Sequence, residues 1–171
     1  MKKEKKFELT NEFITNMFGT KLFRIRALVE FGDVEAGELG GYVEKESNLG
    51  HDDNAWVYDN AWVYGDAQVS GDALVYGNAR VYGDARVCGN GDYAYAHGFG
   101  SVNRTTTFFR LKDGGVGVRC GCFYGTLAQF RDKIRETHGE SAIAEEYLDL
   151  AALMEKRFRR TGNEQKTEEE S

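Results

Sequence analysis

Residues 54–89 repeat one six-residue pattern six times, and this period limits the possible folds more than any other feature of the chain. The units are NAWVYD, NAWVYG, DAQVSG, DALVYG, NARVYG and DARVCG. In each unit Ala and Val alternate with variable residues, which predicts a four-residue strand with its apolar side turned inward. The Gly and the Asn or Asp that follows it predict a corner. Because so short a strand cannot bury its own apolar face, the repeats are expected to coil and stack as a parallel β-helix.

The spacing of branched and small residues resembles the hexapeptide repeat of left-handed parallel β-helix proteins. A Val is followed four positions later by an Ala at Val57 and Ala61, Val63 and Ala67, and Val69 and Ala73. In that family three hexads form one triangular coil. The resemblance therefore implies a mainly β chain whose residues 34–98 form a short left-handed parallel β-helix of about three coils, with residues 34–53 as an irregular entry coil. Only small or β-branched residues fit so narrow a bore, so the larger variable residues are expected outside.

Stacking each hexad on the third one after it sorts the outward residues into columns on three faces. The first face carries Trp56 over Leu74 and Tyr58 over Tyr76, the second carries Trp62 over Arg80 and Tyr64 over Tyr82, and the third carries Gln68 over Arg86 and Ser70 over Cys88. Exposed aromatic patches usually mark interfaces, and aromatic residues beside Arg are common at binding hot spots. We therefore predict a partner or oligomer interface at Trp56, Tyr58, Trp62, Tyr64, Leu74, Tyr76, Arg80 and Tyr82. The competing interpretation is that these rings pack against other parts of the same chain.

Amphipathic segments flank the repeat, which predicts that they fold over its two ends as caps. Residues 1–33 alternate apolar and polar positions, which predicts an N-terminal β-hairpin. Residues 99–160 predict a second β-hairpin that turns at residues 112–115 and keeps Cys120 and Cys122 on one side of its return strand. A capping box at Thr126 then begins a helix that ends at Gly139, and a second helix is expected at residues 141–158. Residues 161–171 are polar and acidic, which predicts a disordered tail.

The composition of the chain argues against nucleic-acid and membrane partners. The net charge of −6 argues against general nucleic-acid binding, because phosphate recognition depends on clustered Lys and Arg. No apolar run reaches the roughly 20 residues of a membrane-spanning helix, and the N-terminus lacks the apolar core of a signal peptide, so we expect a cytoplasmic protein without a membrane partner. The three cysteines are an odd set and indicate no disulfide framework.

Few residues suggest catalysis or cofactor binding. Cys120 and Cys122 with His138 or His97 would be a weak zinc motif, because the second pair of ligands lacks the usual spacing, and buried cysteines are the preferred interpretation. A CoA-dependent acyltransferase would need a histidine base, and only His51 and His97 lie at the ends of the repeat. We therefore expect no catalytic residue, no metal and no cofactor.

Three segments together resemble phage and prophage hexapeptide-repeat proteins of unassigned function, which are sometimes described as polymer-forming. The segments are LFRIRALVEFGDVEAGELGGYVE, the NARVYGDARV array and VRCGCFYGTLAQFRDKIRETHG. The resemblance implies a viral accessory protein in the cytoplasm of a bacterial host. Because left-handed β-helix proteins commonly form homotrimers, we also expect a homo-oligomer, with a trimer favoured. The leading hypothesis is a non-enzymatic protein that binds a host protein and inhibits antiviral defence. The alternatives are capture of a small nucleotide signal, with phosphates held by Arg80 and Arg86, an acyltransferase, and a structural scaffold.

Overall fold

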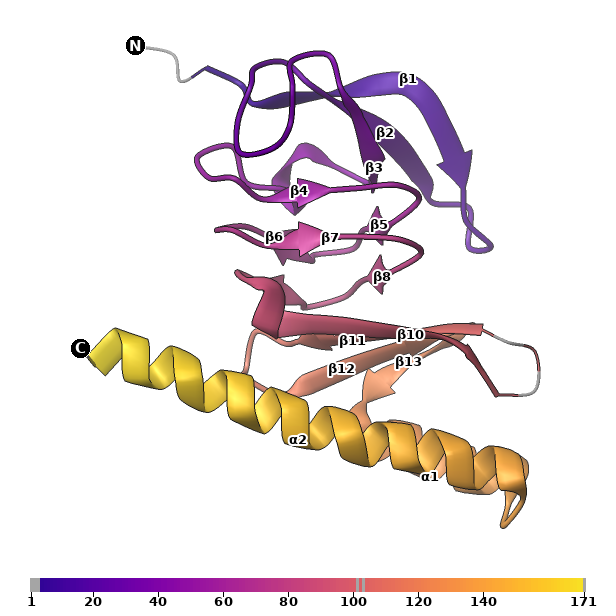
Figure 1. Ribbon diagram of the computed structural model, residues 1–171. Helices are drawn as coiled ribbons and strands as arrows, with labels where there is room; N and C mark the ends of the chain where they lie inside the picture. Colours follow the sequence, from indigo (N-terminus) through magenta and orange to yellow (C-terminus); the bar gives the residue numbers. More distant parts are fainter. Residues whose placement is uncertain (1–3, 101, 103, 171) are drawn as a thin grey trace. The chain divides into compact units, whose positions relative to one another are not determined.

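The computed structural model describes residues 4–100, 102 and 104–170, with side chains described through Glu164. The chain is mainly β, with several sheets and a C-terminal helical hairpin (Figure 1). It divides into two compact units, Met1–Asn90 and Gly91–Ser171. The division falls at residue 90, whereas the sequence places the end of the repeat domain at residue 98, because residues 93–99 form a strand of the second unit's sheet.

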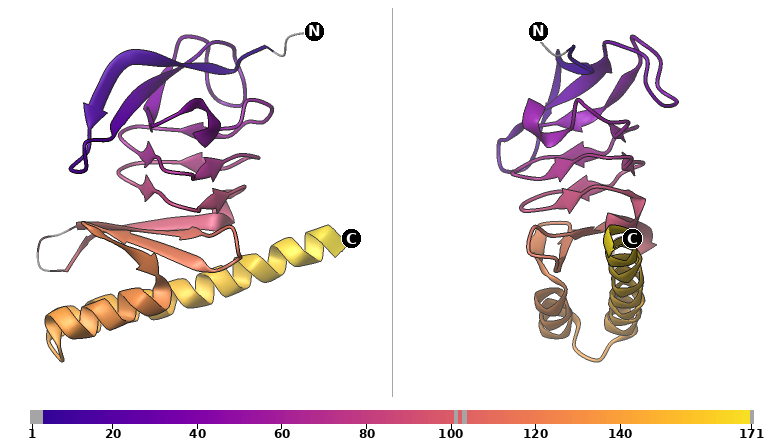
Figure 2. Two further views of the ribbon diagram at one scale, coloured as in Figure 1. Left: turned by 180° about the vertical axis from the view of Figure 1, so that it is seen from behind. Right: turned by 90° about the vertical axis from the view of Figure 1, so that its left-hand side faces the viewer.

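Six two-residue strands of the first unit come from the six repeats. They are β4 (Trp56–Val57), β5 (Trp62–Val63), β6 (Gln68–Val69), β7 (Leu74–Val75), β8 (Arg80–Val81) and β9 (Arg86–Val87). Each strand pairs in parallel with the third strand after it, β4 with β7, β5 with β8 and β6 with β9. The register joins residues 18 positions apart, such as Val57 with Val75. Figure 2 shows these short strands lying in layers. The predicted columns are therefore confirmed.

The alternation of the repeat separates interior from surface. Every Ala and Val at the repeated positions, from Ala55 to Val87, is at most 1% exposed. Burying these methyl groups supplies the apolar stabilisation that a single strand lacks, at about 25 cal/mol per Å² removed from water. Backbone hydrogen bonds then join the layers, as where the Trp56 N–H donates to the Ala73 carbonyl at 3.1 Å. The prediction that Ala and Val face inward is confirmed.

The N-terminal cap is a hairpin that continues into the repeat. It consists of β1 (Phe7–Thr15) and β2 (Lys21–Ala27), and β3 (Leu39–Val43) pairs with β2 on its other side. Because β3 also pairs in parallel with β5, the sheet has the order β1-β2-β3-β5-β8. A short 3₁₀ helix (Glu46–Asn48) leads toward the first repeat. The predicted hairpin is confirmed, and it is an extension of one face of the repeat array.

Carboxylates join the corners of successive layers. The Gly65 N–H donates to Glu44 Oε2 at 2.9 Å, and the Gly71 N–H donates to Asp53 Oδ2 at 2.6 Å. The Gly77 N–H donates to Asp59 Oδ2 at 3.1 Å. Each acidic side chain thus accepts a hydrogen bond from a corner that lies 18 to 21 residues further along the chain. These corner acids are structural, since they satisfy amides that the two-residue strands leave free.

The second unit packs one antiparallel sheet against two helices. The strands are β10 (Tyr93–Phe99), β11 (Arg104–Arg110), β12 (Val116–Cys120) and β13 (Phe123–Thr126), paired in that order after a 3₁₀ turn at Asn90–Asp92. The helices α1 (Leu127–His138) and α2 (Ala142–Glu170) lie side by side (Figure 2). The predicted turn between β11 and β12, the capping box of Thr126 with Gln129 and the end of α1 at Gly139 are all confirmed.

Two details of this unit differ from the sequence predictions. Cys122 is exposed and lies beyond β12, because Gly121 adopts a φ of 58° and turns the chain, whereas Cys120 is buried. The helix α2 runs on to Glu170, through residues predicted to form a disordered tail.

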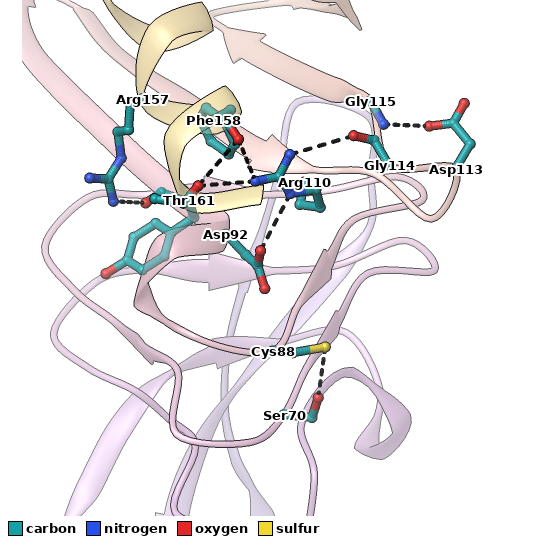
Figure 3. A network of polar contacts seen from close by, with 11 residues as sticks. Ser70, Cys88, Asp92, Arg110, Asp113, Gly114, Gly115, Arg157, Phe158 and Thr161 are labelled. Atoms are coloured by element: carbon teal, nitrogen blue, oxygen red, sulfur yellow. Dashed lines mark hydrogen bonds and ion pairs between the residues drawn. The ribbon is translucent and has the colours of Figure 1, made fainter. Parts of the chain in front are cut away.

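A network around Arg110 of β11 attaches the segment of α2 at Phe158 and Thr161 to the sheet (Figure 3). Arg110 Nη2 donates to the Phe158 carbonyl and to Thr161 Oγ1, both at 3.0 Å, and Arg110 Nε lies 3.4 Å from Asp92 Oδ1. Arg157 Nη2 donates to the Tyr93 carbonyl at 3.0 Å. Thr161 is only 5% exposed, so the first residue of the expected tail belongs to the packed interior.

Candidate functional site

The predicted outward columns of the repeat form three close side-chain pairs. The Tyr58 and Tyr76 rings stack with centroids 4.5 Å apart and an interplanar angle of 9°. The Arg80 guanidinium lies 3.8 Å from the Trp62 ring, and the Tyr64 and Tyr82 rings are 4.5 Å apart. Parallel pairing of strands 18 residues apart places each pair one layer apart, which explains why these contacts recur along the array. The sequence prediction that these residues meet is confirmed.

Trp56, however, is not on the surface. It is 0% exposed, and Phe31 and Phe7 contact its ring edge-on with centroids 5.3 and 6.3 Å away. Gly40 admits this packing, because a Cβ at residue 40 would lie 2.8 Å from the indole. The prediction that Trp56 lies exposed on the first face is therefore wrong, and its ring packs within the chain, as the competing interpretation expects. Its partner in the column, Leu74, is half-buried.

Most of the second face is also covered by the cap. Tyr64 is only 3% exposed and packs with Leu22 and Tyr42. Ile14, Trp62 and Tyr82 are half-buried against this cluster. The sequence pattern placed Tyr64 outward correctly but gave no sign that the β1–β2 hairpin would lie over it. Tyr64 is therefore a core residue, and Trp62 and Tyr82 are partly shielded from any partner.

The two arginines proposed as phosphate ligands already donate to the backbone. Arg80 Nη1 donates to the carbonyls of Asn60, at 3.1 Å, and Asn78, at 2.8 Å. Arg86 Nη1 donates to the Asp66 carbonyl at 2.8 Å. Burial lowers the pKa of Arg80, and Trp62 covers one face of its guanidinium. Both side chains thus link one layer of the array to the next through hydrogen bonds.

The tyrosine stack, Tyr58 and Tyr76, is the part of the predicted surface that stays open. Tyr76 is 41% exposed and Tyr58 is half-buried beneath it. Burial and the neighbouring Tyr76, Glu38 and Asp33 raise the pKa of Tyr58 to about 12, so its hydroxyl remains a hydrogen-bond donor at neutral pH. The stack therefore offers a fixed aromatic surface with hydroxyl groups in acidic surroundings. Such a surface suits a partner that presents basic or apolar side chains.

A second exposed group, at the turn between β1 and β2, was not predicted as a site. Met17 is 68% exposed and Phe18 is 65% exposed, while Phe13 on β1 is 47% exposed. Asn16 Oδ1 holds the turn by accepting from the N–H groups of Phe18 and Thr20, both at 3.0 Å. The signal in the sequence is the apolar pair Met17–Phe18 directly before Gly19, where a hairpin turn is normally polar.

The histidines considered as acyltransferase bases have other contacts. His51 Nδ1 accepts from the Lys6 N–H at 3.1 Å, and its ring stacks on Phe7 with centroids 4.3 Å apart. His97 Nδ1 lies 2.8 Å from Thr105 Oγ1 on a neighbouring strand. Within the described residues, no group of three His, Cys, Asp or Glu side chains is arranged to hold a metal ion. No helix in the part of the chain that the structure describes is long and apolar enough to cross a membrane.

Comparison with known proteins agrees with the repeat architecture. Residues 67–81 match the family model of the YdcK β-solenoid repeat. The match covers β6, β7 and β8, which carry the alternating Ala and Val of the interior. A search of curated proteins finds no match to the chain. The chain is therefore similar to a β-solenoid repeat protein over this segment.

Proposed function

We propose that the chain is a non-enzymatic binding protein and that the tyrosine stack is the centre of its partner-binding surface. The observation that carries the proposal is a pair of parallel rings 4.5 Å apart, one of them 41% exposed, on a rigid array whose other aromatic residues are largely covered. Tyr is enriched at the hot spots of protein interfaces. Because stacking already restricts both rings, a partner would lose little side-chain entropy by ordering them.

The fold gives this surface its rigidity. We propose that the parallel pairs 18 residues apart are successive turns of a left-handed parallel β-helix, as the hexapeptide resemblance implies. In such a helix each ring of the stack is fixed by a strand whose Ala and Val are buried in the interior. The match to a β-solenoid repeat supports this arrangement. A rigid array holds the binding residues in place, which favours recognition of one partner.

The proposed partner is a host protein, and the proposed setting is a phage accessory protein that inhibits antiviral defence. The resemblance of three segments of the chain to phage and prophage proteins supports the setting. The acidic residues Asp33 and Glu38 near Tyr58 support a partner with a basic surface at the contact, since opposite charges favour association.

Affinity purification from the phage-infected host tests the proposal. The double variant Tyr58→Ala, Tyr76→Ala should bind the co-purifying host protein about 30-fold more weakly, which corresponds to ~2 kcal/mol for a hot spot. Cys88→Ala is the matched control, because exposed Cys88 occupies the same position of its repeat as Tyr76 but lies on the third face. Circular dichroism should show both variants folded. Equal recovery of the host protein by wild type and the double variant would contradict the proposal.

A further inference from the structure

A cavity in the second unit is independent of the tyrosine stack. It lies among β11, β12, β13, α1 and α2 and has a volume of about 330 Å³. That volume is at the small end of the range found for ligand pockets, roughly 300 to 1,000 Å³. Its lining includes the charged side chains Arg104 and Lys133, the aromatic side chains Phe123, Phe130, His138 and Tyr147, and Cys122.

The walls of the cavity are aromatic. The Phe130 ring lies 5.6 Å from Phe123 and 5.9 Å from Tyr147, measured between centroids. The His138 ring lies 6.1 Å from Tyr147 at an interplanar angle of 28°. Phe130 and Tyr147 are buried, so these rings are fixed by the core of the unit. Fixed aromatic walls around a small space favour a flat ring as the ligand.

Two of the polar side chains that line the cavity are cations, which donate hydrogen bonds and cannot accept them. Arg104 and Lys133 are cations on β11 and α1, and neither forms an ion pair with a carboxylate within the described part of the chain. No Asp or Glu is among the described residues that line the cavity. Glu146, which directly precedes Tyr147 in α2, accepts a hydrogen bond from the Gly100 N–H at 2.9 Å. The lining itself therefore carries positive charge and no carboxylate, and Glu146, which is not part of it, acts electrostatically on Tyr147.

Two glycines, which have no Cβ, leave space for the Arg104 and Tyr147 side chains. Gly121 has a φ of 58°, and any Cβ there would collide with the Arg104 guanidinium, so Arg104 lies across this turn. Gly100 has a φ of 83°, and a Cβ there would collide with the Tyr147 hydroxyl. Burial and the neighbouring Cys120 raise the pKa of Tyr147 to about 12, so its hydroxyl remains protonated. The turn at Gly121 thus leaves room for the Arg104 guanidinium, whereas the Tyr147 hydroxyl donates to the Phe99 carbonyl at 3.5 Å and Tyr147 contributes its ring to the wall.

We propose that this cavity binds a small planar organic anion, with its ring against Phe130 and Tyr147 and its carboxylate or phosphate group paired with Arg104 and Lys133. Both anionic groups have the oxygen acceptors that a guanidinium and an ammonium recognise. The second unit then has a ligand site of its own, which does not depend on the proposed function of the tyrosine stack.

Calorimetry on the full chain tests the inference with named probes. We expect binding of benzoate, indole-3-carboxylate or adenosine monophosphate with a Kd below about 1 mM, and no heat from adenosine or inorganic phosphate alone. The carboxylate and phosphate arms of the panel distinguish the two anionic groups. Arg104→Gln and Lys133→Gln should each weaken binding about tenfold, the loss expected for one charged hydrogen bond. Lys112→Gln, on the exposed β11–β12 turn, is the control and should leave the Kd unchanged.

Alkylation of the wild-type chain gives a second readout that needs no variant. Cys122 is exposed and lines the cavity, whereas exposed Cys88 belongs to the first unit. A bound anion should slow maleimide labelling of Cys122, measured by peptide mass spectrometry, and leave labelling of Cys88 unchanged. Absence of heat across the whole panel would overturn the inference. It would equally be overturned by binding that the two charge variants leave intact, or by equal protection of both cysteines.

Discussion

Lys6 is a lysine buried at the start of the first unit, and its contacts show how the cap is fixed to the first repeat. Its Nζ donates to the carbonyls of Ala55, at 2.6 Å, and Asp53, at 3.0 Å, and lies 3.3 Å from Asp53 Oδ1. It also lies 4.7 Å from the centroid of the Phe31 ring. Asp53 in turn accepts from the Gly71 N–H, so one ion pair joins the N-terminal strand to two layers of the array. Such a pair is costly to break by removing one partner.

Replacing Lys6 should therefore destabilise the first unit far more than replacing its neighbour. Lys6→Met should lower the free energy of unfolding by about 3 kcal/mol, because Asp53 and two carbonyls lose their donor. Lys5→Met should cost less than about 1 kcal/mol, since the ion pair of Lys5 with Glu46 is exposed. Urea unfolding followed by tryptophan fluorescence measures both, as Trp56 and Trp62 lie in this unit. Equal losses for the two variants would contradict this account of Lys6.

The lowered pKa of Lys6 predicts that the stability of the first unit depends on pH. Burial lowers the pKa of Lys6 despite its partner Asp53, so the folded unit holds this proton less tightly than the unfolded chain does. Between the lowered value and the ordinary lysine pKa the unfolded chain binds more of this proton, so the free energy of unfolding rises with pH across that range. Below the lowered value both states are protonated and this pH-dependent gain is absent. The Lys6→Met chain should lack this part of the pH dependence in the same urea experiment.

At the scale of elements, the corners of the array depend on backbone conformations that glycine adopts readily. Gly65, Gly71, Gly77 and Gly83 have φ values between 64° and 68°, and Asp59, which stands in the place of glycine in the first repeat, has a φ of 55°. The sequence predicted these corners because the period places Gly at the same position in five of the six repeats. Asp59 also accepts a hydrogen bond from the Gly77 N–H of the next layer. A contact between layers depends on how the strands stack, which local turn patterns do not contain.

Alanine substitutions at Gly71 and Gly19 distinguish the energetic cost of backbone strain from the cost of a steric collision. Gly71→Ala should lower the free energy of unfolding by about 3 kcal/mol, because its Cβ would collide with the Cys88 carbonyl as well as strain the backbone. Gly19→Ala should cost only about 1 kcal/mol, since its φ is 83° but no atom lies within 4 Å of the added Cβ. Thermal unfolding monitored by tryptophan fluorescence compares them. A Gly71→Ala chain as stable as Gly19→Ala would contradict the described corner packing.

At the scale of the whole molecule, periodicity predicted the repeat well and the covering segments poorly. The period of six fixed which residues would stack, because strands 18 residues apart pair in register. Which stacked residues stay exposed depends on segments far away in the sequence, so the burial of Trp56 under Phe31 and of Tyr64 beside Leu22 could not be predicted from the repeat. The cavity of the second unit was missed for the same reason. Arg104, Lys133 and Tyr147 come from β11, α1 and α2, and no spacing in the sequence relates them.

The most direct test of the account places a photoreactive amino acid at residue 76 during phage infection. With the crosslinker at residue 76, we expect one covalent product that contains the host protein recovered by affinity purification, and with it at residue 88 we expect none. A product that contains only a second copy of the chain would show that the tyrosine stack is an oligomer interface. That result, or no product at residue 76, would contradict the central claim that the stack binds a host protein.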